Sequence, residues 1–234
     1  MPVSPDKIVI IIPSYNEGAR ILKVVTAIKE HGFHNIVVVD DGSTDDSIEL
    51  VRHLNITIIQ HLVNRGAGAA TETGLKYCRE ILNPETVVMI DADTQHDPND
   101  IRKLIDAHEN QEADITIGNR FMESRGNVPL RNWFYNQVAN VVTGLIAGKN
   151  VRDSQSGFKV FNKRALNQII VEQDKFEHCS EILIKGLEYN FKIIEVPIHV
   201  YYSPETSGKG QHFFNGIRTF INLMHSVLFK SHSK

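Results

Sequence analysis

The chain alternates between short, almost wholly apolar runs and longer stretches in which apolar residues recur at helical spacing. The apolar runs are rich in β-branched residues, which is typical of strands buried on both faces of a parallel sheet. They are residues 7–12, 35–40, 56–60, 87–91 and 114–118. Amphipathic stretches at 18–30 and 68–82 separate them and predict helices. This order predicts an α/β fold with a Rossmann-like, mostly parallel central sheet flanked by helices.

The regular alternation of apolar runs and amphipathic stretches ends after Gly118. Residues 119–132 are polar and contain Gly and Pro, which predicts a loop. The elements expected after it are helices at 132–147, 162–171 and 177–189, a strand in SGFKVFN and a last strand at 191–198. No interdomain linker is evident, so we expect one catalytic domain over 1–205, followed by an amphipathic basic helix over 206–234.

Length and composition favour a single globular domain. The chain has 234 residues, of which 41% are hydrophobic and 23% charged, enough for a full-sized core. Its two cysteines, Cys78 and Cys179, are too few for a disulfide framework and indicate a reducing compartment. The N-terminus does not have the pattern of a signal peptide, and no apolar run approaches the ~20 residues that cross a bilayer.

The net charge of −3 conceals an asymmetry. All 28 acidic residues precede residue 206, whereas Lys209, Arg218, Lys230 and Lys234 follow it. An acidic body argues against general nucleic-acid binding, and a cationic end suits a local anionic partner such as a phosphate or a lipid surface. The apolar stripe of 206–234 either packs on the protein core or lies on an anionic membrane.

The first polar motif is PSYNEG, residues 13–18, directly after the first predicted strand. Ligands of open α/β sheets bind outside the carboxyl ends of the strands. Pro13 would shape the exit of the strand, and Tyr15 offers a flat face for a nucleobase. Asn16 and Glu17 either join this site or merely start the next helix.

The second motif is VVDDGSTDDS, residues 38–47, after the second predicted strand. Ser43 or Thr44 can cap the following helix. Capping does not explain Asp40 and Asp41, which are adjacent acids at the strand end. A carboxylate there could accept hydrogen bonds from a nucleobase or a ribose.

The third motif is NRGAGAA, residues 64–70, after the third predicted strand. Its glycines, Gly66 and Gly68, allow the backbone to approach a ligand closely. The third glycine of a dinucleotide-binding fingerprint and the Gly-Lys-Ser/Thr of a Walker loop are both missing. This motif is weak when taken alone.

The fourth motif is VVMIDADTQHD, residues 87–97, in which a buried strand runs into a group of carboxylates. Residues two apart on a strand point to the same side, so Asp91 and Asp93 converge if the strand continues that far, with Gln95 next on that side. Oxygen ligands of this kind suit Mg²⁺ or Mn²⁺, which often binds one or two carboxylates together with substrate phosphates.

The alternative for this motif is a solvated loop of acids with a helix cap. We disfavour it because Asp97 and Asn99 already suffice to start the next helix. His96 is expected to be structural rather than a metal ligand.

Six segments in this order resemble the family 2 glycosyltransferases of the GT-A fold. Within that family they are most similar to the dolichol-phosphate mannose synthase and polyprenyl-phosphate glycosyltransferase branch. The segments are PSYNE, VVDDGSTDDS, NRGAGAA, DADTQHDP, GNRF and DSQSGFKVF, and they extend over most of residues 8–200.

The resemblance implies a metal-dependent, inverting transfer of a hexose, foremost mannose or glucose, from a GDP- or UDP-hexose. It implies that Asp91, Asp93 and Gln95 hold Mg²⁺ or Mn²⁺ against the donor diphosphate, with Asp93 also counted as catalytic. The positions it implies for the nucleotide-sugar are Pro13, Tyr15, Asn16, Glu17, Asp40, Asp41, Gly66, Ala67, Asp91, Ala92 and Asp93.

The acceptor implied by the resemblance is a polyprenyl phosphate, either dolichyl or undecaprenyl. A phosphate monoester is largely dianionic at pH 7 and needs cations to position it rather than a general base. The candidates for this task are Arg120 and Arg131, both also counted as catalytic, together with Lys209. For Arg120 taken alone, a surface ion pair is the alternative. Tyr135 stands where the family usually has a Ser, which puts the acceptor geometry in question.

The nearest rival function is a related enzyme with a hydroxyl acceptor on a glycan or a small molecule. Such enzymes commonly carry a Gln-x-x-Arg-Trp block, which is missing here, since the only Trp is Trp133. A nucleotidyltransferase would have a Gly-rich basic loop after the first strand, and a non-catalytic binding protein would not need Asp91 and Asp93.

Glu181 is either an acid that lines the site or a surface residue. The protein is expected in the cytoplasm, peripheral on the cytoplasmic face of a membrane.

Overall fold

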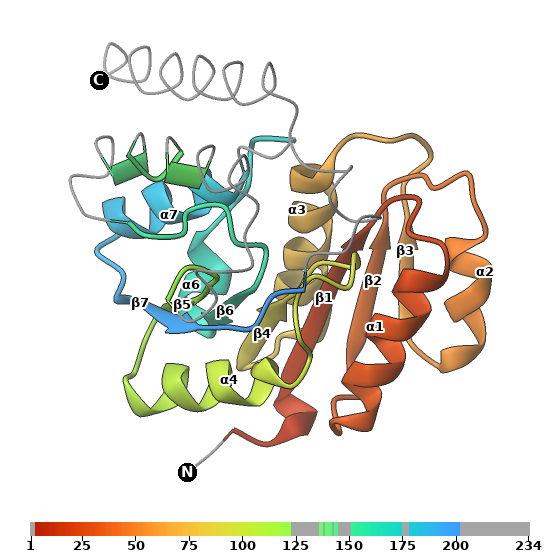
Figure 1. Cartoon of the computed structure of the whole chain (residues 1–234), viewed down its shortest axis with the longest axis horizontal. Coiled ribbons are helices and arrows are strands. Elements are labelled where there is room, and N and C mark those ends of the chain that lie inside the picture. Colours follow the sequence, from red (N-terminus) through yellow and green to blue (C-terminus); the bar gives the residue numbers. More distant parts are fainter. Residues whose placement is uncertain are drawn as a thin grey trace.

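The computed structural model describes residues 3–122, 136–137, 139–141, 143–144, 151–174 and 178–201. Within these residues a seven-stranded sheet has the order β3-β2-β1-β4-β6-β5-β7 (Figure 1). The strands are β1 (Ile8–Ser14), β2 (Ile36–Asp40), β3 (Thr57–Gln60), β4 (Thr86–Met89), β5 (Ile115–Asn119), β6 (Lys159–Asn162) and β7 (Ile193–Pro197).

Helices connect the strands and lie on both faces of the sheet (Figure 1). The longer ones are α1 (Ala19–Glu30), α2 (Ser47–Val51), α3 (Ala67–Tyr77), α4 (Asp100–Asn110), α6 (Lys163–Gln168) and α7 (His178–Glu188). Three short turns of helix are η1 (Pro5–Lys7), η2 (Arg52–Leu54) and η3 (Cys78–Leu82). The predicted order of strands and helices is confirmed.

The sheet is mostly parallel, as predicted. Strand β1 pairs in parallel with β2 and β4, β2 with β3, and β5 with β7. Only β6 is antiparallel, to β4 on one side and β5 on the other. The carboxyl ends of the other strands therefore meet at one edge of the sheet, and the amino end of β6 joins them there.

Apolar side chains bury both faces of the sheet. On one face Ile8, Ile10 and Ile12 of β1 join the residues of α1, α2 and α4 in one core cluster. On the other, Val9 and Ile11 join those of α3, α6 and α7 in a second. Two-sided burial explains why the strand sequences are almost continuously apolar instead of alternating.

Several predicted boundaries are wrong. Strand β4 ends at Met89, before Asp91, whereas the predicted strand runs to residue 91. Helix α6 is shorter than the predicted helix over 162–171. The predicted helix over 68–82 changes at Cys78 into a wider turn, whose last hydrogen bond runs from Asn83 N to Cys78 O. Of the predicted helix over 132–147, residues 136–137, 139–141 and 143–144 are described and helical.

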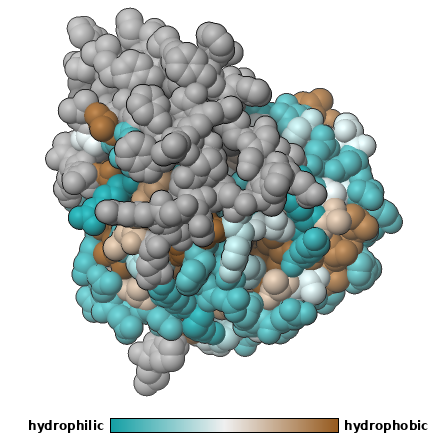
Figure 2. Space-filling model, in the orientation of Figure 1, coloured by the Kyte–Doolittle hydropathy of each residue, from teal (hydrophilic) through white to brown (hydrophobic). Residues whose placement is uncertain are grey.

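The described surface on the side seen in Figure 2 is mostly hydrophilic, with hydrophobic atoms in patches between polar side chains. Among the described residues, no helix combines the length and the apolar character needed to span a bilayer. The predicted basic helix over 206–234 lies outside the described residues.

One buried histidine links the stability of the fold to pH. His108 of α4 is 3% exposed, and its Nδ1 lies 2.8 Å from Thr116 Oγ1 on β5. Its Nε2 has no hydrogen-bond partner within the described part of the chain. Burial lowers the pKa of His108 from 6.5 to about 4, and the opposing charge of Asp114 does not offset it.

We predict that the free energy of unfolding falls as the pH is lowered from about 6.5 to about 4. Over that window the unfolded chain binds a proton at His108 that the folded chain does not, at about 1.4 kcal/mol per pH unit and roughly 3 kcal/mol in total. Urea unfolding of wild type and His108→Gln measures this contribution, which the variant should lack. His53→Gln, at an exposed position, is the control and should keep the wild-type slope. Equal slopes in all three proteins would contradict the prediction.

Candidate functional site

The loops that follow β1, β2, β3 and β4 gather at the carboxyl edge of the sheet, because these strands are parallel neighbours. They carry the first four sequence motifs. The segment before β6, residues 152–158, reaches the same edge. The structure therefore brings together most of the predicted site residues that it describes.

The loops after β1 and β2 are tied to one another. Ser43 Oγ accepts a hydrogen bond from Asn16 N at 2.9 Å, and Asn16 Oδ1 accepts one from Thr44 N at 2.8 Å. Ser47 Oγ accepts from the backbone N–H groups of Glu17 and Gly18. Two loops from different strands thus form one rigid surface.

These contacts correct the capping alternatives. Helix α1 begins at Ala19 after Gly18, so Asn16 does not cap it; a left-handed backbone, φ 51°, directs Asn16 to the neighbouring loop instead. Helix α2 begins at Ser47, so neither Ser43 nor Thr44 caps it. The side chains that looked like local caps make long-range contacts.

Asp41 holds the glycine-rich third loop in place. Its Oδ1 accepts hydrogen bonds from Arg65 N at 2.9 Å and from the His61 ring, whose Nδ1 lies at 2.7 Å. Its Oδ2 accepts one from Gly66 N at 2.7 Å. The backbone of the loop also packs on Gly42, where a Cβ would lie 2.9 Å from Asn64 N.

Asp40 is equally engaged. Its carboxylate accepts hydrogen bonds from Ser43 N at 3.1 Å and Gln60 Nε2 at 3.2 Å. Asp40 and Asp41 are 1% and 2% exposed, so both shape the loops from beneath. Tyr15, in the neighbouring loop after β1, is 42% exposed.

The remaining positions of the first and third motifs lie at the edge as expected. Pro13 is half-buried and belongs to β1, opposite Val39 of β2. Gly66 has φ 119°, a conformation that favours glycine, and Ala67 begins α3. Next to them, Asp174 O accepts hydrogen bonds from the N–H groups at the start of α3.

Glu181 is not a surface residue. It is 7% exposed, and its carboxylate accepts hydrogen bonds from Glu172 N, Gln173 N and Lys185 Nζ. It therefore fixes the segment that leads to Asp174. A buried structural role, the reading not considered from the sequence, is the one the contacts support.

Asp91 and Asp93 lie in a turn beyond β4 and not on the strand. Pairing with β1 ends where Ile90 N donates to Ile11 O. Asp93 Oδ1 then accepts a hydrogen bond from Gln95 N at 2.9 Å, which closes the turn. The prediction that strand alternation makes the two acids converge is wrong in its mechanism, because the turn brings them near one another.

The electrostatics of the two acids differ. Burial raises the pKa of Asp93 to about 6, and the negative charge of Asp91 adds to the rise. Burial also acts to raise the pKa of Asp91, but the hydrogen bond and charge of His96 and the charge of Lys159 outweigh it, so that this pKa is lowered. The pKa of Asp91 is lowered, so its side chain, which is 44% exposed, is ionised at neutral pH. Asp93, with a pKa of about 6, is mostly ionised at the same pH.

Two carboxylates whose charges repel one another suit a divalent cation. Within the described residues, no group of three or more His, Cys, Asp or Glu could enclose a metal alone. A cation at Asp91 and Asp93 would therefore complete its coordination with water, a substrate phosphate and the amide of Gln95, whose side chain makes no hydrogen bond to a described residue. Ala92, between the acids, is buried.

The residues after Asp93 lead to α4, which begins at Asp100. His96 is 4% exposed, with its Nε2 3.3 Å from Asp91 Oδ2 and its ring against Phe158. Asn99 occupies the N-cap position without a capping hydrogen bond, and instead its N–H donates to Asp97 Oδ1. Asp97 thus shapes the helix start, as expected, but Asn99 is not the cap it resembles.

Arg120 forms a buried ion pair. Its Nε and Nη2 donate to the two oxygens of Asp153 at 2.9 and 2.7 Å, and its backbone N donates to the same carboxylate. The two side chains are 12% and 0% exposed, so the surface ion pair considered for Arg120 is wrong. Arg131, Tyr135 and Lys209 lie outside the described residues.

The motif DSQSGFKVF, residues 153–161, carries part of the resemblance, but the sequence predicts no role for its individual residues. Glu195 Oε1 accepts hydrogen bonds from Arg152 N and Asp153 N, and Asn140 Oδ1 accepts from Ser154 N. A lysine in an apolar predicted strand, Lys159, was the signal that could have drawn attention to it.

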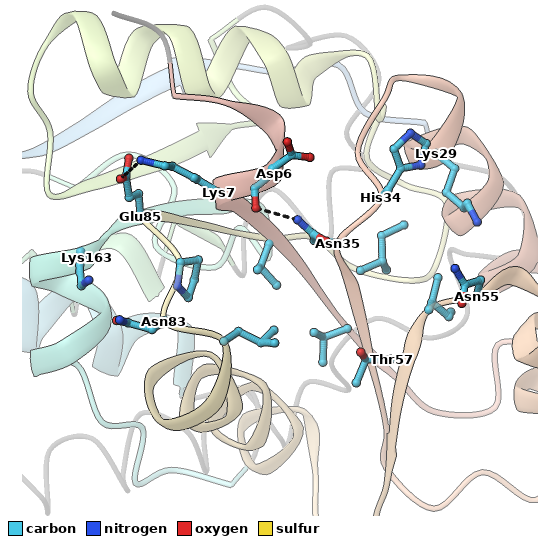
Figure 3. Close-up of a pocket in the computed structure, with 16 residues that line it drawn as sticks. Asp6, Lys7, Lys29, His34, Asn35, Asn55, Thr57, Asn83, Glu85 and Lys163 are labelled. Carbon is cyan, nitrogen blue, oxygen red and sulfur yellow. Dashed lines mark hydrogen bonds and ion pairs between the residues drawn. The ribbon is translucent and has the colours of Figure 1, made fainter.

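A hollow of about 740 Å³ lies at the opposite, amino edge of the sheet (Figure 3). Two pairs of its lining residues contact one another: Lys7 Nζ pairs with Glu85 at 2.5 Å, and Asn35 Nδ2 donates to Asp6 O at 2.9 Å. Figure 3 draws both contacts as dashed lines. None of the sequence motifs reaches it, so we place the candidate site at the carboxyl edge.

Comparisons with known proteins show the family of the chain. The profile of the family described as Glycosyl transferase family 2 matches residues 9–170. UDP-N-acetylglucosamine–dolichyl-phosphate N-acetylglucosaminyltransferase of Methanococcus voltae is 34% identical over 94% of this chain and 96% of its own length. Dolichol-phosphate mannosyltransferase of Pyrococcus furiosus is 32% identical over 93% of this chain and 64% of its own length.

A solved structure shows the same fold. Glucosyl-3-phosphoglycerate synthase of Mycobacterium tuberculosis, in complex with Mn²⁺ and UDP-glucose, has a TM-score of 0.73 and 15% identity to this chain. The match covers 94% of this chain and 77% of that one. This likeness confirms the predicted GT-A fold.

We predict that Asp41→Asn loosens the third loop. The amide keeps one acceptor oxygen but turns an NH₂ group toward backbone N–H donors, so it should lower the free energy of unfolding by about 1–3 kcal/mol. Hydrogen exchange at the Arg65 and Gly66 amides should become faster. Asp46→Asn, at an exposed position in the preceding loop, should change neither quantity. Wild-type exchange in Asp41→Asn would show that the carboxylate does not hold the loop.

Proposed function

The chain belongs to glycosyl transferase family 2, and from that membership we propose that it moves a hexose from a nucleotide-sugar to a polyprenyl phosphate. The reaction we propose is metal-dependent and inverts the sugar carbon. The observation that carries it is the pair of mutually repelling carboxylates, Asp91 and Asp93, beside the loops of the carboxyl edge. The names of the dolichyl-phosphate relatives support the acceptor class.

Asp91, Asp93 and Gln95 would hold the cation, Mg²⁺ or Mn²⁺. When bound, it supplies a Lewis acid that neutralises the charge that builds on the leaving diphosphate. Asp91 provides a carboxylate that stays ionised, because His96 and Lys159 favour its charged form. Asp93, with a pKa of about 6, provides the second charge at neutral pH.

The nucleoside would lie on the joined loops after β1, β2 and β3. Tyr15 presents its ring to a base, and the neighbouring backbone is held rigid by Asn16, Asp40 and Asp41. A preorganised surface lowers the ordering cost of binding. The remaining contacts that we propose for the nucleotide-sugar are Pro13, Glu17, Gly66, Ala67 and Ala92.

The acceptor phosphate would be positioned by Arg120, with Arg131, Tyr135 and Lys209 as further contacts. A phosphate monoester reacts as a dianion and needs no general base. The hydroxyl-acceptor alternative needs such a base. We further propose that the protein works at the cytoplasmic face of a membrane, where residues 206–234 attach it peripherally.

We predict that purified protein forms a lipid-linked sugar from a short polyprenyl phosphate, one member of a GDP- and UDP-hexose panel, and Mg²⁺ or Mn²⁺. Asp93→Asn should reduce the rate at least about 100-fold, because it removes several kcal/mol of charge stabilisation from the transition state. Asp97→Asn, in the same segment but with a carboxylate that binds Asn99 and Tyr201, should keep most of the activity. Undiminished product from Asp93→Asn, or transfer only to hydroxyl acceptors, would contradict the proposal.

We predict that a double variant separates two roles of Arg120, its ion pair with Asp153 and its proposed contact with the acceptor phosphate. Arg120→Met alone strands the charge of Asp153 in the interior and should cost about 3–5 kcal/mol of stability. Adding Asp153→Asn removes that charge and should restore most of the stability. The KM for polyprenyl phosphate should nevertheless stay raised at least about tenfold while the KM for the donor is unchanged, because a phosphate contact is lost.

The matched control replaces the pair Arg164 and Asp114, which joins α6 to β5 with N···O 3.1 Å. Arg164→Met with Asp114→Asn should leave both KM values near wild type. A double variant of Arg120 and Asp153 with a wild-type KM for the acceptor would show that this arginine is only structural.

A further inference from the structure

Gly157 lies against the carboxylate of Asp91. In the antiparallel pair of β4 and β6, Met89 is opposite Lys159 and Val87 is opposite Phe161. Two residues beyond the end of this pairing, Gly157 and Asp91 lie next to one another. A Cβ added at Gly157 would lie 2.0 Å from Asp91 Oδ2 and 2.3 Å from Oδ1. The carboxylate therefore fills the space in which any other side chain would begin.

The backbone around Gly157 is held from both sides. Before it, Ser154 N donates to Asn140 Oδ1 at 2.8 Å. After it, Phe158 O accepts from Gly118 N of β5 at 2.9 Å. Retreat of this segment would break hydrogen bonds of buried groups at about 1–3 kcal/mol each, so it cannot easily yield to a side chain at position 157.

The carboxylate of Asp91 is also held. His96 Nε2 lies 3.3 Å from Oδ2, and Gly157 closes another side. Lys159, which is 0% exposed, donates to Ser156 O and has no ion pair among the described residues. The positive charge of this buried ammonium favours the ionised form of Asp91.

We propose that Gly157 is a positioning residue for the cation site, because only a residue without a side chain leaves the Asp91 carboxylate where it binds the metal. This inference rests on the proposed function, which makes Asp91 a metal ligand. A methyl group at position 157 must stay at least about 3 Å from the carboxylate oxygens. It would displace them by about 1 Å, whereas metal–oxygen distances tolerate about 0.2 Å.

The first test measures Mn²⁺ binding to the full chain by electron paramagnetic resonance, with Mn²⁺ alone and with Mn²⁺ plus UDP or GDP. Gly157→Ala should weaken Mn²⁺ binding at least about tenfold. Gly186→Ala is the matched control: its Cβ would lie 3.0 Å from Ile115 Cδ1, in the core and away from Asp91, and Mn²⁺ should bind as in wild type.

The second test separates the contact from a general effect on folding. Gly157→Ala is compared in wild type and in an Asp91→Ala background by urea unfolding. Because Asp91→Ala removes the oxygens that the methyl group would meet, the loss of stability caused by Gly157→Ala should shrink at least by half. An equal loss in both backgrounds would overturn the proposal even if Gly157→Ala folds too poorly for the binding test.

The outcomes distinguish this inference from the proposed function. If wild type binds Mn²⁺ and Gly157→Ala binds it equally well, the role of Gly157 is refuted and the proposed function stands. If wild type binds no Mn²⁺ with or without a nucleoside diphosphate, both are refuted.

Discussion

Burial of the sheet on both of its faces is the constraint on which the site depends. Helices cover each face with apolar side chains, so a polar side chain can be displayed only where the strands end. Since β1, β2, β3 and β4 are parallel, their ends coincide and four loops meet. The polar side chains of the candidate site are concentrated at one edge, because apolar side chains cover the two faces of the sheet.

The loops at that edge are built from polar contacts between distant parts of the chain. Asp41 binds backbone 24 and 25 residues later, and Asp153 binds Arg120 33 residues earlier. Each contact satisfies a buried charge and at the same time fixes a loop. The acids of the edge therefore divide into two groups: Asp40, Asp41 and Asp153 hold the structure, whereas Asp91 and Asp93 remain as the pair that a cation would satisfy.

Much of the layout could be predicted from the sequence. Continuous β-branched runs located the strands, and the acids after them located the edge, because both signals are local. Two predictions that proved wrong concern residues whose contacts lie far along the chain. Asn16 and Ser43 are residue types that commonly cap helices, yet they join separate loops. Asn99 stands at the N-cap position of α4, but its N–H donates to Asp97. Gly157 gave no signal, because its role depends on the insertion of β6 beside β4, a pairing of residues about 70 apart.

The central claim is that Asp91 and Asp93 hold a divalent cation at the carboxyl edge of this glycosyltransferase. Anomalous diffraction from a crystal grown with Mn²⁺ and a nucleoside diphosphate tests it most directly. We expect one strong peak about 2.0–2.3 Å from an oxygen of each carboxylate, with the diphosphate completing the coordination. A nucleotide bound at this edge with no manganese peak at either aspartate, or a peak elsewhere, would contradict the account.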